Sequence, residues 1–200
     1  PPTTQPNDAR KLALFSLDAL LHDSRLDQTP YFTKYIEQVG QQIVDGLKKP
    51  IGKNETRVFR FYNHGFIVQS AKATIAFDLV RGGKPGKHFF TEQTMTDIAA
   101  LCDVLFVSHI HSDHADKVVA DQFLQAGKPV VTPTNIWKGT PANHIQWRDE
   151  KVLDKTLELL NKASLKVRIF PGHQDNVPNN VYAVTRSEER RVGKECWCSC

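Results

Sequence analysis

The chain has 200 residues, of which 24% are charged and 40% hydrophobic, and this balance excludes a chain that is disordered throughout. No apolar run approaches the roughly 20 residues that cross a bilayer, so no membrane span is expected. The net charge of +4 is spread along the chain and is densest in residues 186–200, so it predicts no nucleic-acid partner.

The chain begins at Pro1 and not at a methionine, so an upstream targeting segment could be missing. The compartment therefore stays open between the cytoplasm and export. The sequence leaves the oligomeric state open as well.

Residues 1–55 predict a polar lead and a helical extension that precedes the main domain. Asp8 can cap a first helix and Thr29 a second one, which Pro50 ends. The second helix has hydrophobic residues at helical spacing, namely Tyr31, Tyr35, Ile36, Val39, Ile43 and Leu47.

Residues 56–185 form the predicted main domain, which opens with three β-like runs. These runs span 58–62, 65–68 and 73–77 and are separated by turn residues, so they predict an antiparallel meander. The later patterns predict helices from Thr94 or Thr96 to about 102, over 115–125 and over 156–162, and strands over 103–107, 129–131, 165–170 and 181–184. Between them, 135–154 predicts only a short helix at 136–137 and a strand near 145.

Three histidines and an aspartate follow the buried strand over 103–107, and they form a predicted metal-binding loop. Residues two apart in an extended segment point the same way, so His109 and His111 can bind one cation. Asp113 and His114, around the next bend, can then face a second cation. Imidazole mixed with carboxylate suits zinc, iron or manganese better than magnesium or calcium. The alternative is a polar loop with surface histidines.

A further histidine, His173, follows the strand over 165–170 in the run Pro-Gly-His. Together with the His-x-His-x-Asp-His run, it makes residues 58–185 resemble the metallo-β-lactamase superfamily. The resemblance implies an α/β protein with an αββα sandwich, here mainly its N-terminal half, and one or two metal ions at one edge. It also implies the ligands: His109, His111 and His173 for the first metal, and Asp113 and His114 for the second.

Two other residues gain roles from this resemblance. Asp78, at the end of the third β-like run, would fix the metal loop through hydrogen bonds; the alternative is an exposed strand-end aspartate. The turn at 63–66 and the run at 113–116 look like the branch that contains ascorbate-6-phosphate lactonase and phospholipase-D-like hydrolases. In that reading His64 could contact substrate, and the alternative is a turn histidine with a structural role.

The implied activity is that of a metallo-hydrolase with one or two Zn²⁺ ions, or with iron or manganese. A metal-activated hydroxide, oriented by Asp113, would attack a small-molecule ester, lactone, amide or phosphodiester. Three rivals stay open: an iron-dependent redox enzyme on the same scaffold, a nuclease, and a non-catalytic metal-binding protein. The nuclease is disfavoured because no basic stripe is interleaved with aromatic residues.

Residues 186–200 have no hydrophobic period and resemble a translated sequencing adapter, so we expect them to be a non-native tail. The alternative is that Cys196, Cys198 and Cys200 bind a metal or form a disulfide. The resemblance also leads us to expect a bridging aspartate and a final histidine beyond this point, so the second metal site would be incomplete. We therefore expect an enzyme as the parent protein, and a poorly stable, nearly inactive fragment in this chain.

Overall fold

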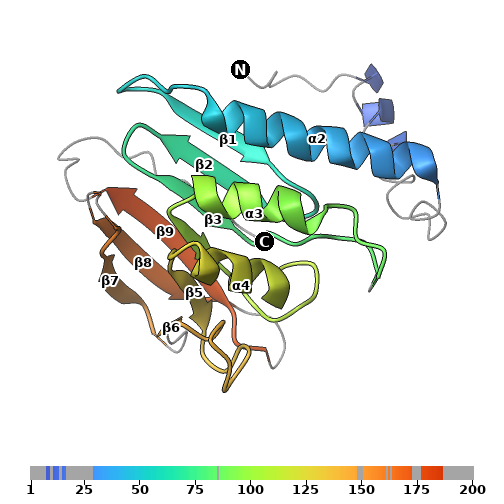
Figure 1. The fold of residues 1–200 in the computed structure, drawn as a ribbon. Coiled ribbons are helices and arrows are strands. Elements are labelled where there is room, and N and C mark those ends of the chain that lie inside the picture. The colour runs from blue at the N-terminus through green and yellow to red at the C-terminus, as the bar shows by residue number, and fades with distance from the viewer. Residues whose placement is uncertain are drawn as a thin grey trace.

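A computed structural model describes residues 8–9, 11–13, 15–16, 29–84, 86–147, 151–160, 162, 164–172 and 177–186. Within this part, a layer of helices covers one face of a six-stranded sheet, and a three-stranded sheet packs against its other face (Figure 1). The class is therefore α/β, with the two facing sheets and outer helices that the sequence predicted. His173 and residues 187–200 of the predicted tail lie outside the described residues, whereas residue 186, the first of that tail, is described as part of a strand.

The helical layer consists of α2 (Pro30–Lys48), α3 (Glu92–Leu101) and α4 (Lys117–Gln125), with α3 between the other two (Figure 1). The prediction that α3 starts at Thr94 or Thr96 is wrong. Thr91 caps it, because its side chain accepts a hydrogen bond from the backbone N–H of Thr94.

The six-stranded sheet runs in chain order, from β1 (Thr56–Arg60) through β2 (Phe66–Ser70), β3 (Thr74–Phe77), β4 (Val104–Phe106) and β5 (Val130–Pro133) to β6 (Ile145–Trp147). The first three strands form the predicted antiparallel meander, and β3 to β6 are parallel to one another. Parallel strands end at the same edge of a sheet, so the loops after β3, β4 and β5 meet there.

The second sheet consists of β7 (Leu153–Leu157), β8 (Leu165–Pro171) and β9 (Asn180–Arg186), all antiparallel. The predicted helix over 156–162 is wrong, because Thr156 and Leu157 belong to β7 and the other described residues of this range, 158–160 and 162, are not helical. Leu157 pairs with Leu165, and its apolar side chain is buried in the core between the sheets, so strand pairing and burial both favour β7 over a helix here.

Two hydrophobic cores hold these layers together. The core under the helices includes Ile43, Ile67, Met95, Ile98, Leu105 and Phe123. The core between the sheets includes Phe106, Val131, Trp147, Val167, Ile169 and Tyr182. Strand β4 is buried on both faces, with Leu105 in the first core and Phe106 in the second. Because β4 leads directly into the predicted metal loop, that loop starts from one of the most enclosed strands of the fold.

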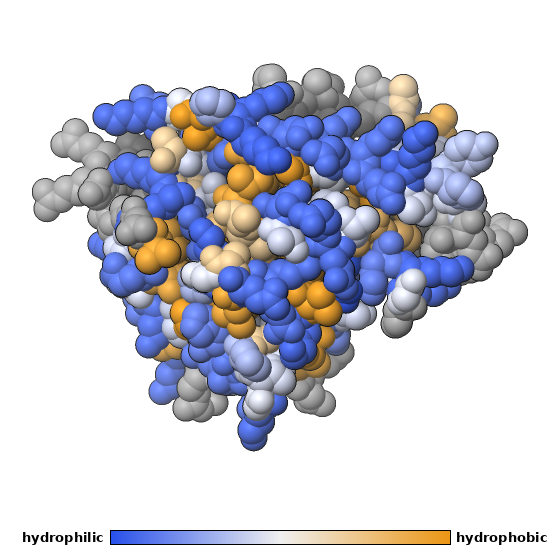
Figure 2. Space-filling view, viewed as in Figure 1, coloured by the Kyte–Doolittle hydropathy of each residue, from blue (hydrophilic) through white to orange (hydrophobic). Residues whose placement is uncertain are grey.

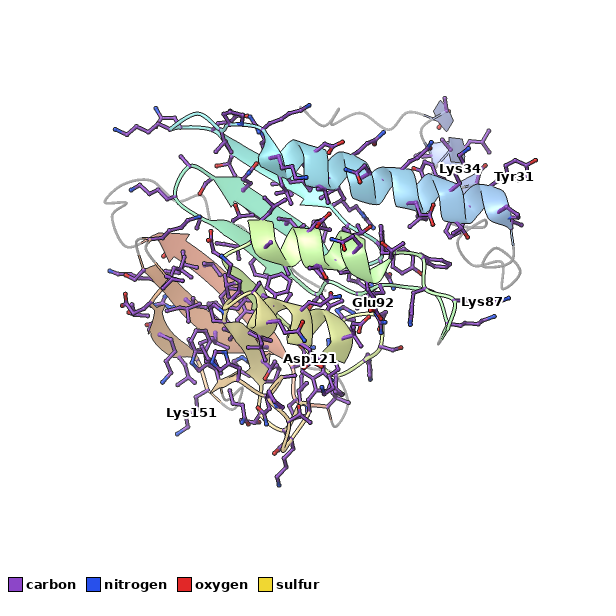
Figure 3. The ribbon with its side chains drawn as sticks, in the orientation of Figure 1. Tyr31, Lys34, Lys87, Glu92, Asp121 and Lys151 are labelled. Carbon is purple, nitrogen blue, oxygen red and sulfur yellow. The ribbon has the colours of Figure 1, made fainter. Side chains whose placement is uncertain are left out.

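Helix α2 packs into the first core through Ile36, Ile43, Val44 and Leu47, so it is part of the helical layer. Its predicted apolar face is wrong at the first turns. Tyr31 is 87% exposed and projects away from the ribbon in Figure 3, and Tyr35 is also exposed. The division between an extension and a main domain at residue 55 stays a prediction.

The segment after β5 contains turns and not the predicted short helix at 136–137. Asn135 and Trp137 have φ values of 68° and 50°, in the left-handed region, which is incompatible with a right-handed helix. The predicted strand near 145 is confirmed as β6.

No described helix has an apolar stretch that could cross a bilayer. Figure 2 shows the helical face of the molecule, which is mostly hydrophilic with small, separated hydrophobic areas.

Candidate metal centre

Strand pairing brings three separate segments to one edge of the large sheet. Phe66, the first residue of β2, pairs with Phe77, the last residue of β3, so the turn between β1 and β2 lies beside Asp78. Phe77 in turn pairs with Phe106, which places the loop after β4 on the other side of Asp78. The turn that carries His64, the carboxylate of Asp78 and the loop over 108–114 are therefore neighbours.

Asp78 is the buried centre of this edge, with 5% of its surface exposed, so the alternative of an exposed strand-end aspartate is wrong. Its Oδ1 accepts a hydrogen bond of 2.7 Å from the backbone N–H of Ser108, and its Oδ2 accepts one of 2.8 Å from the Ser108 hydroxyl. Its Oδ2 also lies 2.9 Å from Nδ1 of His114. Hydrogen bonds to an ionised carboxylate are among the stronger ones, so these contacts fix the loop to the end of β3.

These contacts determine which ring nitrogens are protonated. A carboxylate only accepts, so Nδ1 of His114 donates to Asp78. The single hydroxyl proton of Ser108 is given to Asp78, so Ser108 Oγ accepts from Nδ1 of His109 at 2.9 Å. In neutral imidazole the other nitrogen then has a lone pair. For both His109 and His114 that nitrogen is Nε2, the atom a metal would bind.

His109 and His111 approach each other closely, with 3.2 Å between Nε2 of His109 and Nδ1 of His111. Two nitrogens bound at about 2.0–2.1 Å to one tetrahedral zinc lie about 3.3 Å apart, so the pair fits a shared cation. His109 is 1% exposed, whereas His111 is exposed. Burial and the nearby His114 lower the pKa of His109 to about 4, so its imidazole is neutral at pH 7.

A second group forms beside this pair. His64, Asp113 and His114 offer ligand atoms that all lie within 4.8 Å of one another, and such a group could hold a metal ion. Asp113 Oδ2 lies 3.5 Å from Nε2 of His64 and 3.7 Å from Nε2 of His114. The imidazole rings of His64 and His114 are stacked, with 4.4 Å between centroids and 9° between planes. Imidazole and carboxylate donors fit zinc, iron or manganese.

The end of the metal loop is held by an ion pair between Arg81 and Asp116, which was not predicted from the sequence. Nε of Arg81 lies 2.8 Å from Oδ2 of Asp116, and Nη2 lies 3.1 Å from Oδ1. Asp116 also caps α4 by accepting from the backbone N–H of Val118. Burial raises the pKa of Asp116, but the hydrogen bonds and charge of Arg81 outweigh it and the net shift is downward. The side chains of both residues are only 12% exposed. The metal loop is therefore held at its start by the bonds between Ser108 and Asp78 and at its end by this ion pair.

The strand pairing of the small sheet leads to the same edge. The backbone N–H of Asn180 donates to the carbonyl of Ser108 at 2.9 Å, and Gly172 N–H donates to the carbonyl of Asn179. Tyr182 Oη, in the same strand as Asn180, donates to the carbonyl of Val107. Gly172, which precedes His173 in the sequence, is thus bonded to Asn179, and the next residue, Asn180, is bonded to Ser108 at the start of the metal loop. The role of His173 itself stays a prediction.

The structure brings six of the seven predicted site residues to this edge, and the seventh, His173, lies outside the described residues. Five of the six are Asp78, His109, His111, Asp113 and His114. His64 also lies here, beside Asp113 and His114. The stacking of His64 on His114 was not predicted, since the two rings are fifty residues apart in the sequence. It could have indicated Asp116 as a helix cap, because an aspartate precedes the apolar run of α4. The roles of all seven toward a metal stay predictions.

Comparison with solved structures finds similar folds. A metallo-β-lactamase from Pontibacter korlensis matches 64% of this chain and 60% of its own length, with 23% identity and a TM-score of 0.40. A variant of the CmlA β-hydroxylase matches 68% of this chain and 29% of its own length, with 16% identity and a TM-score of 0.43. The match thus spans less than two thirds of either protein. No protein-family model and no curated protein sequence matches the chain.

Proposed function

We propose that this chain contains the metal-binding edge of a metal-dependent hydrolase that acts on an ester, lactone, amide or phosphodiester. One observation carries the proposal: Asp78 accepts a hydrogen bond from Nδ1 of His114, and Ser108 Oγ accepts one from Nδ1 of His109. Both Nε2 lone pairs are thereby turned toward the space beside His111 and Asp113. Such outer hydrogen bonds to the non-ligating nitrogen are typical of metal-binding histidines.

In this proposal His109, His111 and His173 hold one cation, and Asp113 and His114 hold a second. Zinc suits this donor set best, and iron or manganese is compatible with it. A divalent cation bound there would lower the pKa of a coordinated water from about 16 to about 7 and would polarise a carbonyl or phosphoryl oxygen.

The exposure of the site supports catalysis over a purely structural role. Asp113 and His64 have 43% and 46% of their side chains exposed, so a small molecule can reach them. A structural zinc site is closed by four protein ligands, whereas a catalytic site keeps a position open. In this proposal Asp113, anchored through its neighbour His114, holds and orients a nucleophilic water against a bound substrate.

The test is metal-dependent turnover of chromogenic ester, lactone and phosphodiester substrates by the chain and by the complete product of its gene. We expect turnover that needs added zinc or manganese, weak for these 200 residues and stronger for the complete product. His111→Ala and Asp113→Ala should abolish it while the circular dichroism spectrum stays unchanged. His144→Ala, which removes an exposed histidine away from the group, serves as the matched control. Turnover that persists without metal would overturn the proposal. Stoichiometric iron with oxygen consumption would favour the redox enzyme instead.

A further inference from the structure

The turn between β1 and β2 has a rigid geometry that its sequence explains. Its backbone is closed by hydrogen bonds from Gly65 N–H to the carbonyl of Tyr62 and from Phe61 N–H to the carbonyl of Gly65. Asn63 has a φ of 56°, a conformation that asparagine tolerates better than most residues. A Cβ at Gly65 would lie 3.1 Å from the carbonyl oxygen of Asp78, so the turn is packed tightly against the end of β3.

This turn presents His64 to the metal loop in a defined orientation. The ring lies parallel to that of His114, and its Nε2 faces the same oxygen of Asp113 that Nε2 of His114 faces. The two separations, 3.5 and 3.7 Å, are a few tenths of an ångström longer than the roughly 3.3 Å between ligand atoms of a tetrahedral zinc. The three ligand atoms all lie within 4.8 Å of one another, so a shared cation would also require the stacked rings of His64 and His114 to turn toward it.

We propose that His64 is a ligand of the second cation, together with Asp113 and His114. This inference rests on the proposed function and assigns a residue from the β1–β2 turn to a site for which the metal loop alone supplies two ligands. Three protein ligands with one open position make a complete catalytic-type zinc site. In this arrangement the second cation needs no ligand from residues that follow β9 in the sequence.

The contrasting role for His64 is contact with substrate, and metal binding measured without substrate separates the two. Zinc stoichiometry and affinity are measured by titration calorimetry on the full chain in which Cys196, Cys198 and Cys200 are replaced by serine, so that thiols cannot bind the metal. We expect two zinc ions for this reference. His64→Ala should retain the first and bind the second at least about 100-fold more weakly, a larger loss than that of an outer hydrogen-bond partner.

His144→Ala is the matched control and should bind both ions as the reference does. A second measurement does not depend on a variant: in the reference chain, the ring resonances of His64 should shift in NMR spectra with the second equivalent of zinc. Two tightly bound ions in His64→Ala, or unshifted His64 resonances, would overturn this inference and leave the proposed function standing. Failure of the reference chain to bind any zinc would overturn the proposed function as well.

Discussion

The two halves of the candidate metal centre are built in opposite ways. The half around His109 is enclosed, since that ring is 1% exposed and is fixed through Ser108 to the end of β3. The half around Asp113 opens to solvent, and of its three donors only His114 is buried. One carboxylate, Asp78, supports both halves, because it is hydrogen-bonded directly to His114 and through Ser108 to His109.

This difference indicates that the two halves have different roles in binding metal and substrate. In the enclosed half, His109 is buried and held by Ser108 before any cation binds, so we expect this half to bind tightly and to contribute to stability. The open half has two donors that are exposed to solvent, His64 and Asp113, so it should bind more weakly and is the half that a substrate can reach. Variants can therefore separate the halves.

Asp78→Asn should have the largest effect, because it weakens both halves. The amide cannot accept from Ser108 N–H, Ser108 Oγ–H and His114 Nδ1–H as the carboxylate does. We expect a loss of about 3 kcal/mol in the free energy of unfolding, measured in urea without metal, and weaker binding of both zinc ions. Asparagine keeps the volume and tolerates the φ of 46° at this position.

The matched control for that change is Asp154→Asn, which removes a carboxylate whose partner is Arg168 on the exposed surface of the small sheet. Its urea midpoint should stay close to that of the reference, since exposed ion pairs contribute little. Equal midpoints for the two variants would contradict the role of Asp78 as the common anchor.

His111→Ala should break the enclosed half alone. The residue is exposed, so the metal-free chain should unfold at the same urea concentration as the reference. The first zinc ion should bind at least about 100-fold more weakly, and the stabilisation that zinc gives to the reference should fall accordingly. Unchanged affinity for the first ion would place the first site elsewhere.

Arg81→Lys should weaken the open half by a smaller amount. Lysine keeps the charge but loses the two-pronged contact with Asp116, which fixes the end of the metal loop. We expect the second zinc ion to bind about 10-fold more weakly, as is usual for a change outside the ligands themselves, with the first ion unaffected. Equally weakened binding of both ions would show that the Arg81–Asp116 ion pair supports the whole loop.

The smallest effect concerns Cys102, whose thiol is fully buried in the core under the helices. Burial and the nearby Asp103 raise the pKa of this thiol, so it stays neutral and unreactive across pH 7–9 in the folded chain. Peptide mapping after labelling should find Cys102 modified only on unfolding, even in His111→Ala. Early labelling in that variant would mean that the site and the helical core open together.

The sequence predicted the parts of this fold that follow from local patterns. The meander over β1 to β3 and the buried strand before the metal loop are examples, because alternation and continuous apolar runs directly reflect burial. It failed at β7, since exposed polar residues at the centre of that strand conceal the alternation and only pairing with β8 defines it.

The candidate site divides in the same way. Four donors lie within six consecutive residues, so their proximity was visible in the sequence. The stack of His64 on His114 and the clamp of Arg81 on Asp116 join residues that are 35 to 50 positions apart. Such contacts depend on strand order and on a tight turn at Asn63, which no local pattern reports.

The protonation of His109 and His114 tests the central claim most directly. Long-range ¹H–¹⁵N NMR spectra of the metal-free chain at pH 7 distinguish the two neutral tautomers of each ring. Asp78 and Ser108 should hold both rings with the proton on Nδ1, and zinc should then shift both Nε2 resonances. A proton on Nε2 of either ring, or Nε2 resonances that zinc leaves unchanged, would contradict a centre prepared for metal by the residues behind it.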